Sequence, residues 1–281
     1  LVDQVANGLL ATFVGEDSEK TDTDYKAFLP KASVQYFFTP DVSTAFSVQK
    51  GYRAGGSSVS QISGQIKDFD PESTLNYELA FRNVLMEQRL FLNANIFYTD
   101  WKDQQVDVSI SGDARDTYTG NAGQSKLYGF EVELTAKIAT DWEMFANAGY
   151  VKTEFEEFML NRGGNIEDYN DNEFAGAPNI TSTLGVVYQP RKGWFAQADV
   201  NYQDESYLDN ANTREADSRT LVNTKLGYRW QQVSAYLWGR NIFDKQYIAN
   251  SWEEEAAIPA VQDYQMPGAP RSIGVSLAVD F

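Results

Sequence analysis

Two glutamates at spacing two, Glu131 and Glu133, come closest in this chain to a pair that could perform acid–base chemistry. Paired carboxylates can share the acid and base roles of a glycosidase. Residues two apart in an extended segment, however, point to the same side, so the pair also fits the polar face of a strand. The chain has no histidine and no cysteine, which excludes His-based triads, thiol nucleophiles and the usual transition-metal ligands. We therefore expect no enzymatic activity and no cofactor.

The acidic stretch Asp168-Tyr-Asn-Asp-Asn-Glu173 is a second place where chemistry could occur. It begins like a calcium-binding loop, in which alternate residues supply oxygen ligands. Glu173 stands where that loop requires a glycine, and Asn179 stands where a bidentate glutamate would close the site. The stretch therefore fits a solvated acidic loop better, and no metal site is assigned.

The overall charge limits the partners that the chain can have. Its 281 residues include 23 basic and 40 acidic side chains, for a formal net charge of −17. Binding to nucleic acid requires clustered Lys and Arg against the phosphates, so we expect no nucleic-acid partner.

The elements that would position any site are strands. No run of 18 apolar residues is present, so the sequence predicts no transmembrane helix. The last residues alternate instead: Ile273, Val275, Leu277, Val279 and Phe281 share one face of a strand that ends on an aromatic residue. Outer-membrane barrels usually close with such a strand, and we expect Phe281 to act as the barrel's assembly signal. A soluble β-sandwich could also end this way, so the other segments of the chain are needed to distinguish the two folds.

Long and short connections alternate along the chain. The short ones fall near residues 39–42, 85–88, 138–141, 190–193 and 231–232, and the long ones are rich in Asp, Glu, Asn, Ser and Gly. Transmembrane barrels have short periplasmic turns and long outer loops, whereas a sandwich has no reason to alternate in this way. The segments predicted as strands are 1–12, 32–38, 43–53, 74–84, 89–104, 124–137, 142–155, 177–189, 194–205, 218–229, 233–243 and 270–281.

Opposite faces of these segments differ in polarity. From Tyr128 to Lys137, apolar residues at even positions oppose Glu131, Glu133 and other polar residues at odd positions. Ten such residues rise about 33 Å and, when tilted, match a hydrophobic band about 25 Å tall. The sequence thus predicts an all-β chain that forms an antiparallel transmembrane β-barrel with about 12 strands.

Six segments resemble, in the same order, the barrels of TonB-dependent outer-membrane receptors. They are Ser47-Val-Gln-Lys-Gly-Tyr-Arg-Ala-Gly-Gly56, Leu75-Asn-Tyr-Glu-Leu-Ala-Phe-Arg82, Tyr128-Gly-Phe-Glu-Val-Glu133, Thr220-Leu-Val-Asn-Thr-Lys-Leu-Gly-Tyr228, Gly239-Arg-Asn-Ile-Phe-Asp-Lys-Gln-Tyr247 and Pro267-Gly-Ala-Pro-Arg-Ser272. The resemblance covers essentially the whole chain. It implies a barrel of 22 strands plugged by an amino-terminal domain.

The resemblance also implies which part of a receptor this chain represents and where the receptor is located. We expect residues 1–281 to be the carboxy-terminal half of one barrel domain, with the plug and the partner-binding segment outside this chain; an independent 12-stranded barrel is the alternative. The expected location is the outer membrane of a Gram-negative bacterium, crossed many times. The implied partners are outer-membrane lipid, lipopolysaccharide, the barrel assembly machinery, and TonB through the missing amino-terminal part.

The function that the resemblance implies is energised uptake of a scarce ligand, for which we expect a ferric siderophore or another iron chelate. An anionic chelate would seek the cations that the registers place toward the lumen, Arg53, Arg82, Lys225, Arg229 and Arg240. The plainer role of these cations is structural pairing with Glu78, Glu131, Glu133 or Asp199, and this pairing is the interpretation that the sequence favours. Candidate ligand contacts are Tyr52, Arg53, Arg82, and, in the last long loop, Asn250, Trp252 and Tyr264.

Other functions of the same architecture remain open. Carbohydrate or cobalamin could be the cargo, and a passive porin or a surface-binding barrel would share the alternation of loops.

Overall fold

A computed structural model describes residues 26–60, 64–109, 117–162, 165–255 and 261–279. Every regular element in these ranges is a strand, as the sequence predicts. The described residues include no helix long and apolar enough to cross a membrane.

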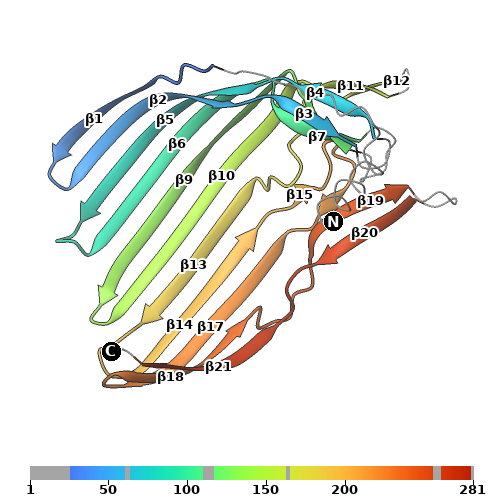
Figure 1. Ribbon diagram of the computed structural model, residues 1–281. Coiled ribbons are helices and arrows are strands. Elements are labelled where there is room, and N and C mark those ends of the chain that lie inside the picture. Colours follow the sequence, from blue (N-terminus) through green and yellow to red (C-terminus); the bar gives the residue numbers. More distant parts are fainter. Residues whose placement is uncertain (1–25, 61–63, 110–116, 163–164, 256–260, 280–281) are drawn as a thin grey trace, which may run out of the picture.

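Eleven strands form one antiparallel sheet in the order β1-β2-β5-β6-β9-β10-β13-β14-β17-β18-β21. Figure 1 shows this sheet curled into a trough, with β1 and β21 at its two edges. The strands are β1 (Lys31–Thr39), β2 (Val42–Arg53), β5 (Glu72–Leu85), β6 (Leu90–Lys102), β9 (Gln124–Ala139), β10 (Trp142–Glu157), β13 (Ile180–Tyr188), β14 (Gly193–Gln203), β17 (Arg219–Trp230), β18 (Val233–Arg240) and β21 (Ser272–Val279).

The predicted segments match these strands closely. Eleven of them coincide with strands of the sheet to within a few residues, and the predicted segment 1–12 lies outside the described residues. All the short connections lie at one end of the trough, here called the short-turn end, and the long connections lie at the other, the long-loop end (Figure 1). The antiparallel barrel-like topology is therefore confirmed, although the described strands form an open sheet.

The two faces of the sheet differ as the alternation predicts. Glu133 of β9 pairs with Asn93 of β6 and Asn147 of β10, whereas the neighbouring Val132 pairs with Ala94 and Ala148. Polar side chains therefore line the concave inner face, and apolar ones cover the convex outer face. The outer-face residues Phe130, Leu184, Leu226 and Val275 are each more than two-fifths exposed, which fits a surface that faces lipid.

The long connections contain short strands that the alternation in the sequence does not predict. Five of them form two-stranded hairpins beyond the main sheet. These hairpins are β3 (Gly56–Val59) with β4 (Ile66–Phe69), β7 (Gln105–Ser109) with β8 (Thr117–Asn121), β11 (Met159–Arg162) with β12 (Asn165–Asp168), β15 (Ser206–Tyr207) with β16 (Glu215–Ala216), and β19 (Ile248–Glu255) with β20 (Val261–Pro267).

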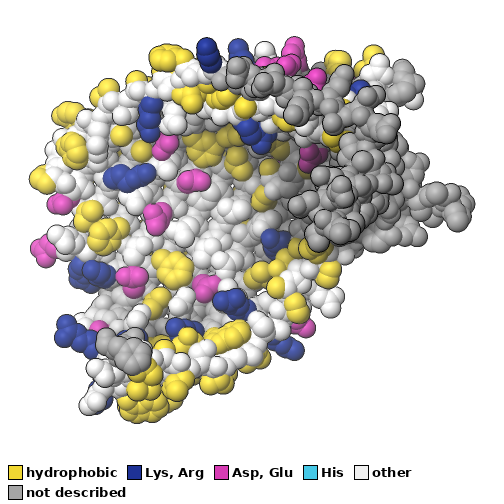
Figure 2. All heavy atoms as spheres, viewed as in Figure 1, with side chains coloured by type: hydrophobic (Ala, Val, Ile, Leu, Met, Phe, Trp, Pro, Cys, Tyr) yellow, Lys and Arg dark blue, Asp and Glu magenta, His cyan; other side chains and the backbone are white. Residues whose placement is uncertain are grey.

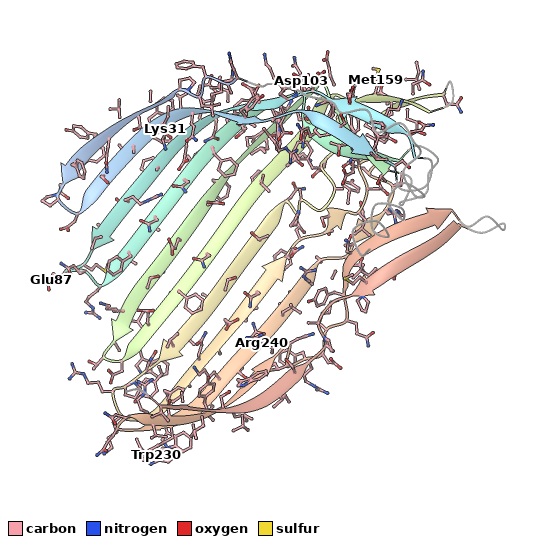
Figure 3. The ribbon with its side chains drawn as sticks, in the orientation of Figure 1. Lys31, Glu87, Asp103, Met159, Trp230 and Arg240 are labelled. Atoms are coloured by element: carbon pink, nitrogen blue, oxygen red, sulfur yellow. The ribbon has the colours of Figure 1, made fainter. Side chains whose placement is uncertain are left out.

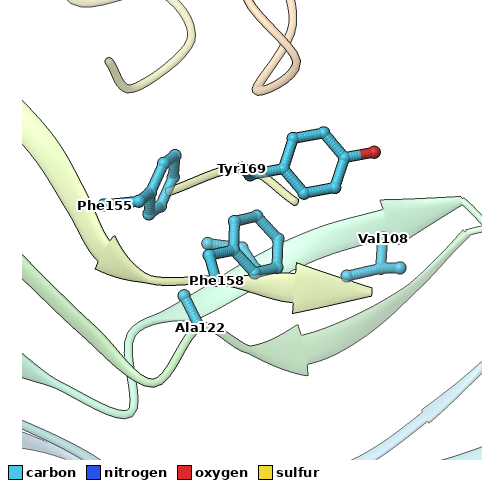
Figure 4. Close-up of a cluster of buried hydrophobic side chains, with 6 residues drawn as sticks. Val108, Ala122, Phe155, Phe158 and Tyr169 are labelled. Atoms are coloured by element: carbon cyan, nitrogen blue, oxygen red, sulfur yellow. The ribbon is translucent and has the colours of Figure 1, made fainter. Parts of the chain in front are cut away.

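The buried apolar core of the described chain lies at the long-loop end. It consists of Val106, Val108, Ala122, Phe155, Phe158 and Tyr169, here called the loop core (Figure 4). These residues come from β7, the segment between β8 and β9, the end of β10 and the segments beside β11 and β12. A barrel wall faces lipid on one side and its lumen on the other, so a dry core forms only where the loops fold over one another.

Candidate functional site

A polar groove of about 580 Å³ runs along the inner face of the trough. Figure 2 shows this hollowed face, on which acidic and basic side chains are scattered among uncharged polar ones. The side chains that line the groove come from β5, β6, β9, β10, β13, β14 and β17: Arg82, Asn93, Asn95, Glu131, Glu133, Asn147, Thr181, Thr183, Asn201, Gln203, Arg219 and Leu221. Amides and hydroxyls dominate, so the groove can accept and donate hydrogen bonds along its length.

The five cations predicted to face the lumen all belong to the inner-face set. Arg53 pairs with Glu72 in the register, Arg82 with Asn93 and Lys225 with Gln197. Arg229 and Arg240 share the face of Lys225 by strand alternation and pairing. Figure 3 shows Arg240 on the wall of the trough, toward the long-loop end of β18.

The predicted ion pairs between these cations and Glu78, Glu131, Glu133 or Asp199 do not form in the described part of the chain. Arg82 donates instead to Asn95 Oδ1 at 2.8 Å. Lys225 lies over the Tyr236 ring at 4.1 Å, Arg229 over Phe195 at 5.4 Å and Arg240 over Trp238 at 5.6 Å. The prediction of pairing with these four carboxylates was wrong, and for Asp199 and Glu133 the reason is that side-chain amides are their hydrogen-bond partners.

Side-chain amides occupy two of those carboxylates. Asp199 accepts from Asn201 at 2.7 Å and from Asn223 at 2.8 Å, and Glu133 accepts from Asn93 at 3.2 Å. These amides satisfy the acceptors without neutralising the cations. The wall therefore keeps positive groups that have no carboxylate partner in the described residues and could attract an anion.

Arg53 is the exception, because it is an anchor of the loop structure. Its guanidinium donates to Glu72 at 3.0 and 3.1 Å, and Glu72 also accepts from the Gln105 backbone N–H at 2.6 Å. The buried Glu72 carboxylate thus ties β2 and β5 to the start of β7. Tyr52, the other half of the predicted contact, belongs to the outer face by its pairing with Ser73, so it points away from the groove.

Replacing Glu72 by glutamine should loosen this tie. The lost charge weakens the bonds from Arg53 and Gln105, and a hydrogen bond to a charged group is worth about 1.5–3 kcal/mol. Hydrogen exchange of the full-length protein should show faster exchange at the Gln105 amide and in β7. The matched control is Glu87→Gln in a short turn at the opposite end (Figure 3), where no change is expected. Unchanged protection of β7 in the Glu72 variant would show that Glu72 does not hold the loop.

Arg219 is an inner-face cation that sequence reasoning missed. It lines the groove and also a smaller cavity of about 230 Å³ between the loops, with Gln203, Leu208 and Asn250. Its guanidinium donates to Gln203 Oε1 at 2.6 Å and stacks over the Tyr247 ring at 4.4 Å. Its spacing from Lys225 could have placed it on the polar face, since residues six apart in a strand share a side.

The predicted contacts in the last long loop lie on one hairpin. Asn250 lines the smaller cavity, and Trp252 pairs with Tyr264 across β19 and β20. The hairpin brings Asn250 and Arg219 to one cavity, whereas Arg82 lies far along the groove toward the short turns. Phe281 lies outside the described residues.

The acidic stretch does not gather carboxylates around one point. Asp168 accepts from the Asn170 backbone N–H at 2.9 Å, and Glu173 forms an ion pair with Lys152. No group of three potential metal ligands occurs among the residues that the structure describes.

Comparison with known proteins decides the family. The family described as "TonB dependent receptor-like, beta-barrel" matches residues 4–242. The chain belongs to the TonB-dependent receptor family. This match confirms the resemblance found in the six sequence segments. Members of the family are receptors and transporters of the Gram-negative outer membrane, which agrees with the all-strand architecture.

The similar TonB-dependent receptors are longer than this chain. The pesticin receptor of Yersinia pestis is 24% identical over 283 residues, which cover 99% of this chain and 39% of that protein. A probable TonB-dependent siderophore receptor of Acinetobacter baumannii, PiuA, is 27% identical over 216 residues, covering 75% of this chain and 28% of that protein. The chain thus spans about two-fifths or less of the length of these relatives.

Solved structures of the family share the fold. The ferric yersiniabactin uptake receptor FyuA from Yersinia pestis superimposes with a TM-score of 0.74 at 24% identity, covering 90% of this chain and 37% of that one. The siderophore receptor PiuA from Acinetobacter baumannii gives a TM-score of 0.69 at 26% identity, with coverage of 89% and 35%. The described sheet therefore has the fold of part of a TonB-dependent receptor barrel.

Proposed function

We propose that this chain is part of the barrel of an outer-membrane receptor that imports an anionic iron chelate, most simply a ferric siderophore, with energy supplied through TonB. The short-turn end would face the periplasm and the long-loop end the cell exterior. The chain itself would supply one wall of the lumen, and a plug domain would fill it. Outer-membrane lipid, lipopolysaccharide and the barrel assembly machinery are the further partners that this placement implies.

The observation that carries the proposal is the set of inner-wall cations without carboxylate partners. Arg219, Lys225 and Arg240 are held by neutral amides or aromatic rings, so their charge is available to a ligand even though the chain is acidic overall. Two of the similar proteins support the same cargo, because PiuA is described as a probable siderophore receptor and FyuA as a ferric yersiniabactin uptake receptor.

Uptake by cells tests this proposal. A strain that lacks the gene and the same strain complemented with the full-length gene would be supplied, under iron limitation, with a panel of radioiron chelates that includes ferric citrate, catecholates and hydroxamates. We expect at least one chelate to enter only when the gene is present. If no chelate depends on the gene, the cargo is of another class, and carbohydrate and cobalamin are the next candidates.

Replacing Arg219 by glutamine should weaken binding of the chelate identified by that panel. One lost charge-assisted hydrogen bond is worth about 1.5–3 kcal/mol, which corresponds to roughly a 10- to 150-fold increase in Kd. Binding would be measured on purified full-length receptor by titration with the chelate. Lys192→Gln, an exposed cation in a short turn, is the matched charge control and should leave the Kd unchanged. Equal effects of the two changes on the Kd would show that Arg219 does not contact the chelate.

A further inference from the structure

A second cavity lies at the short-turn end of the trough, away from the groove and the loops. Its volume is about 640 Å³, and its lining includes four cations, Arg89, Lys137, Arg191 and Arg229, with Asp141 and Glu143 as the acidic members. The cations come from the β5–β6 turn, the end of β9, the β13–β14 turn and the end of β17. Four neighbouring hairpins therefore each direct a positive group to one place.

These charges are not neutralised within the described part of the chain. None of the four cations forms an ion pair there, and Lys137 does not do so even though Glu143 is its direct cross-strand partner. The hydrogen bonds of two of them go to backbone carbonyls instead: Arg89 donates to Lys137 O at 3.1 and 3.2 Å, and Arg229 donates to Pro190 O at 3.4 Å. Carbonyls hold the guanidinium groups in position and leave their positive charge free for an anion.

The Arg229 guanidinium also has an unfilled donor. Its Nε atom is buried and has no hydrogen-bond partner, and its plane lies over Phe195 at 5.4 Å. A buried donor without a partner is costly, and an acceptor from a bound molecule can relieve that cost. In a chain of net charge −17, four positive groups gathered around one cavity without an ion pair among the described residues indicate a local preference for anions.

We propose that this cavity is an anion-binding site for a small polycarboxylate, and that an anionic iron chelate meets it at the periplasmic end of its passage. The role in passage of the chelate rests on the proposed function, whereas the binding of a polycarboxylate does not. The site would lower the energy of the anion after it leaves the groove and bias its exit toward the periplasm. A bidentate carboxylate fits the guanidinium groups of Arg89, Arg191 and Arg229, and Lys137 adds a single donor.

Protection of Lys137 from chemical modification tests the site directly. Purified full-length receptor would be labelled with an amine-reactive reagent, and the rate at Lys137 followed by mass spectrometry with and without citrate, at constant ionic strength. With a Kd of about 1 mM, about 10 mM citrate would occupy roughly nine-tenths of the sites and slow labelling of Lys137 roughly tenfold. Lys192, exposed at the same end but outside the cavity lining, should label at an unchanged rate.

A variant at the rim of the cavity provides a second test of the site. Arg191→Gln removes an exposed cation from the cavity rim, so it should leave the basal labelling of Lys137 intact and reduce its protection by citrate several-fold. Absence of citrate protection in the parent protein would overturn the proposal. Lys137 that is unreactive without citrate would also overturn it, because the rest of the receptor would then occupy the cavity.

The result of the labelling experiment does not depend on the result of the uptake experiment that tests the proposed function. Labelling does not require transport, so citrate can protect Lys137 even if uptake of no iron chelate depends on the gene. That result would disprove the role of the cavity in chelate passage and leave its binding of polycarboxylates intact. If a chelate does depend on the gene, Arg191→Gln should slow energised uptake while surface binding to de-energised cells stays unchanged. Loss of both in parallel would place Arg191 in the outer site and contradict a role at the exit.

Discussion

Replacing Val132 by arginine should cost roughly 2–4 kcal/mol of folding free energy, whereas Thr135→Arg in the same strand should cost little. Val132 lies on the outer face of β9 between Ala94 and Ala148, where lipid would surround it near the middle of the strand. Thr135 lies on the inner face between Phe91 and Phe145. A charge on the lipid face loses its hydration in the bilayer, but one on the lumen face remains in contact with water.

The measurement is folding of full-length receptor into lipid vesicles, titrated with urea for the parent and the two variants. The difference between the variants is the informative quantity, because any general effect of adding a cation to β9 is shared. Equal tolerance of arginine at the two positions would contradict a membrane-spanning wall with this polarity.

The sequence predicts the sheet well because the alternation of side chains is a local property. The pattern from Tyr128 to Lys137 determines which residues of β9 face lipid. Cross-strand pairing then determines which residues of the two neighbouring strands, β6 and β10, lie on the same face. Even the inner-face position of Lys225 and Arg229 follows from counting along β17. Six ordered segments were enough to recognise the family for the same reason, since each is a short run of neighbouring residues in the sequence.

The partners of the inner-wall residues could not be predicted in this way. Asp199 accepts from Asn223 on the next strand, and Glu72 from Gln105 on a distant loop, so each partner depends on register or on how loops fold over one another. Arg219 shows a different limit. Its face is predictable from alternation, but its place between two cavities depends on the position of the β19–β20 hairpin and on the ring of Tyr247.

The hairpins in the long connections were missed for a physical reason as well. Segments such as β7 and β8 are five residues long and lie within polar, glycine-containing stretches, so their period-two signal is weak. Their stability comes from the loop core, which assembles residues that lie far apart in the sequence. A local pattern cannot show that Phe158 and Val108 meet.

Replacing Phe158 by alanine should therefore have a large but local effect. Phe158 is 2% exposed and packs against Phe155 and Tyr169 with ring centroids 4.9 and 5.0 Å apart (Figure 4). Removal of a buried phenylalanine side chain typically costs about 3–5 kcal/mol. The loop core lies at the long-loop end of the sheet, where Phe155 of β10 contributes to it, so the loss should fall on the β7–β8 and β11–β12 hairpins and leave the rest of the sheet folded.

Hydrogen exchange and limited proteolysis of the full-length receptor distinguish these regions. Protection should fall in residues 105–109, 117–121 and 159–162, while the strands β5, β6 and β9 keep theirs. Met159→Ala is the matched control, because Met159 follows Phe158 directly and is 61% exposed, so its truncation should change little. Under the proposed function, the Phe158 variant should also bind its chelate more weakly, because the loops above the groove would have to be ordered during binding. Loss of protection throughout the sheet would instead show that the loop core and the barrel wall fold as one cooperative unit.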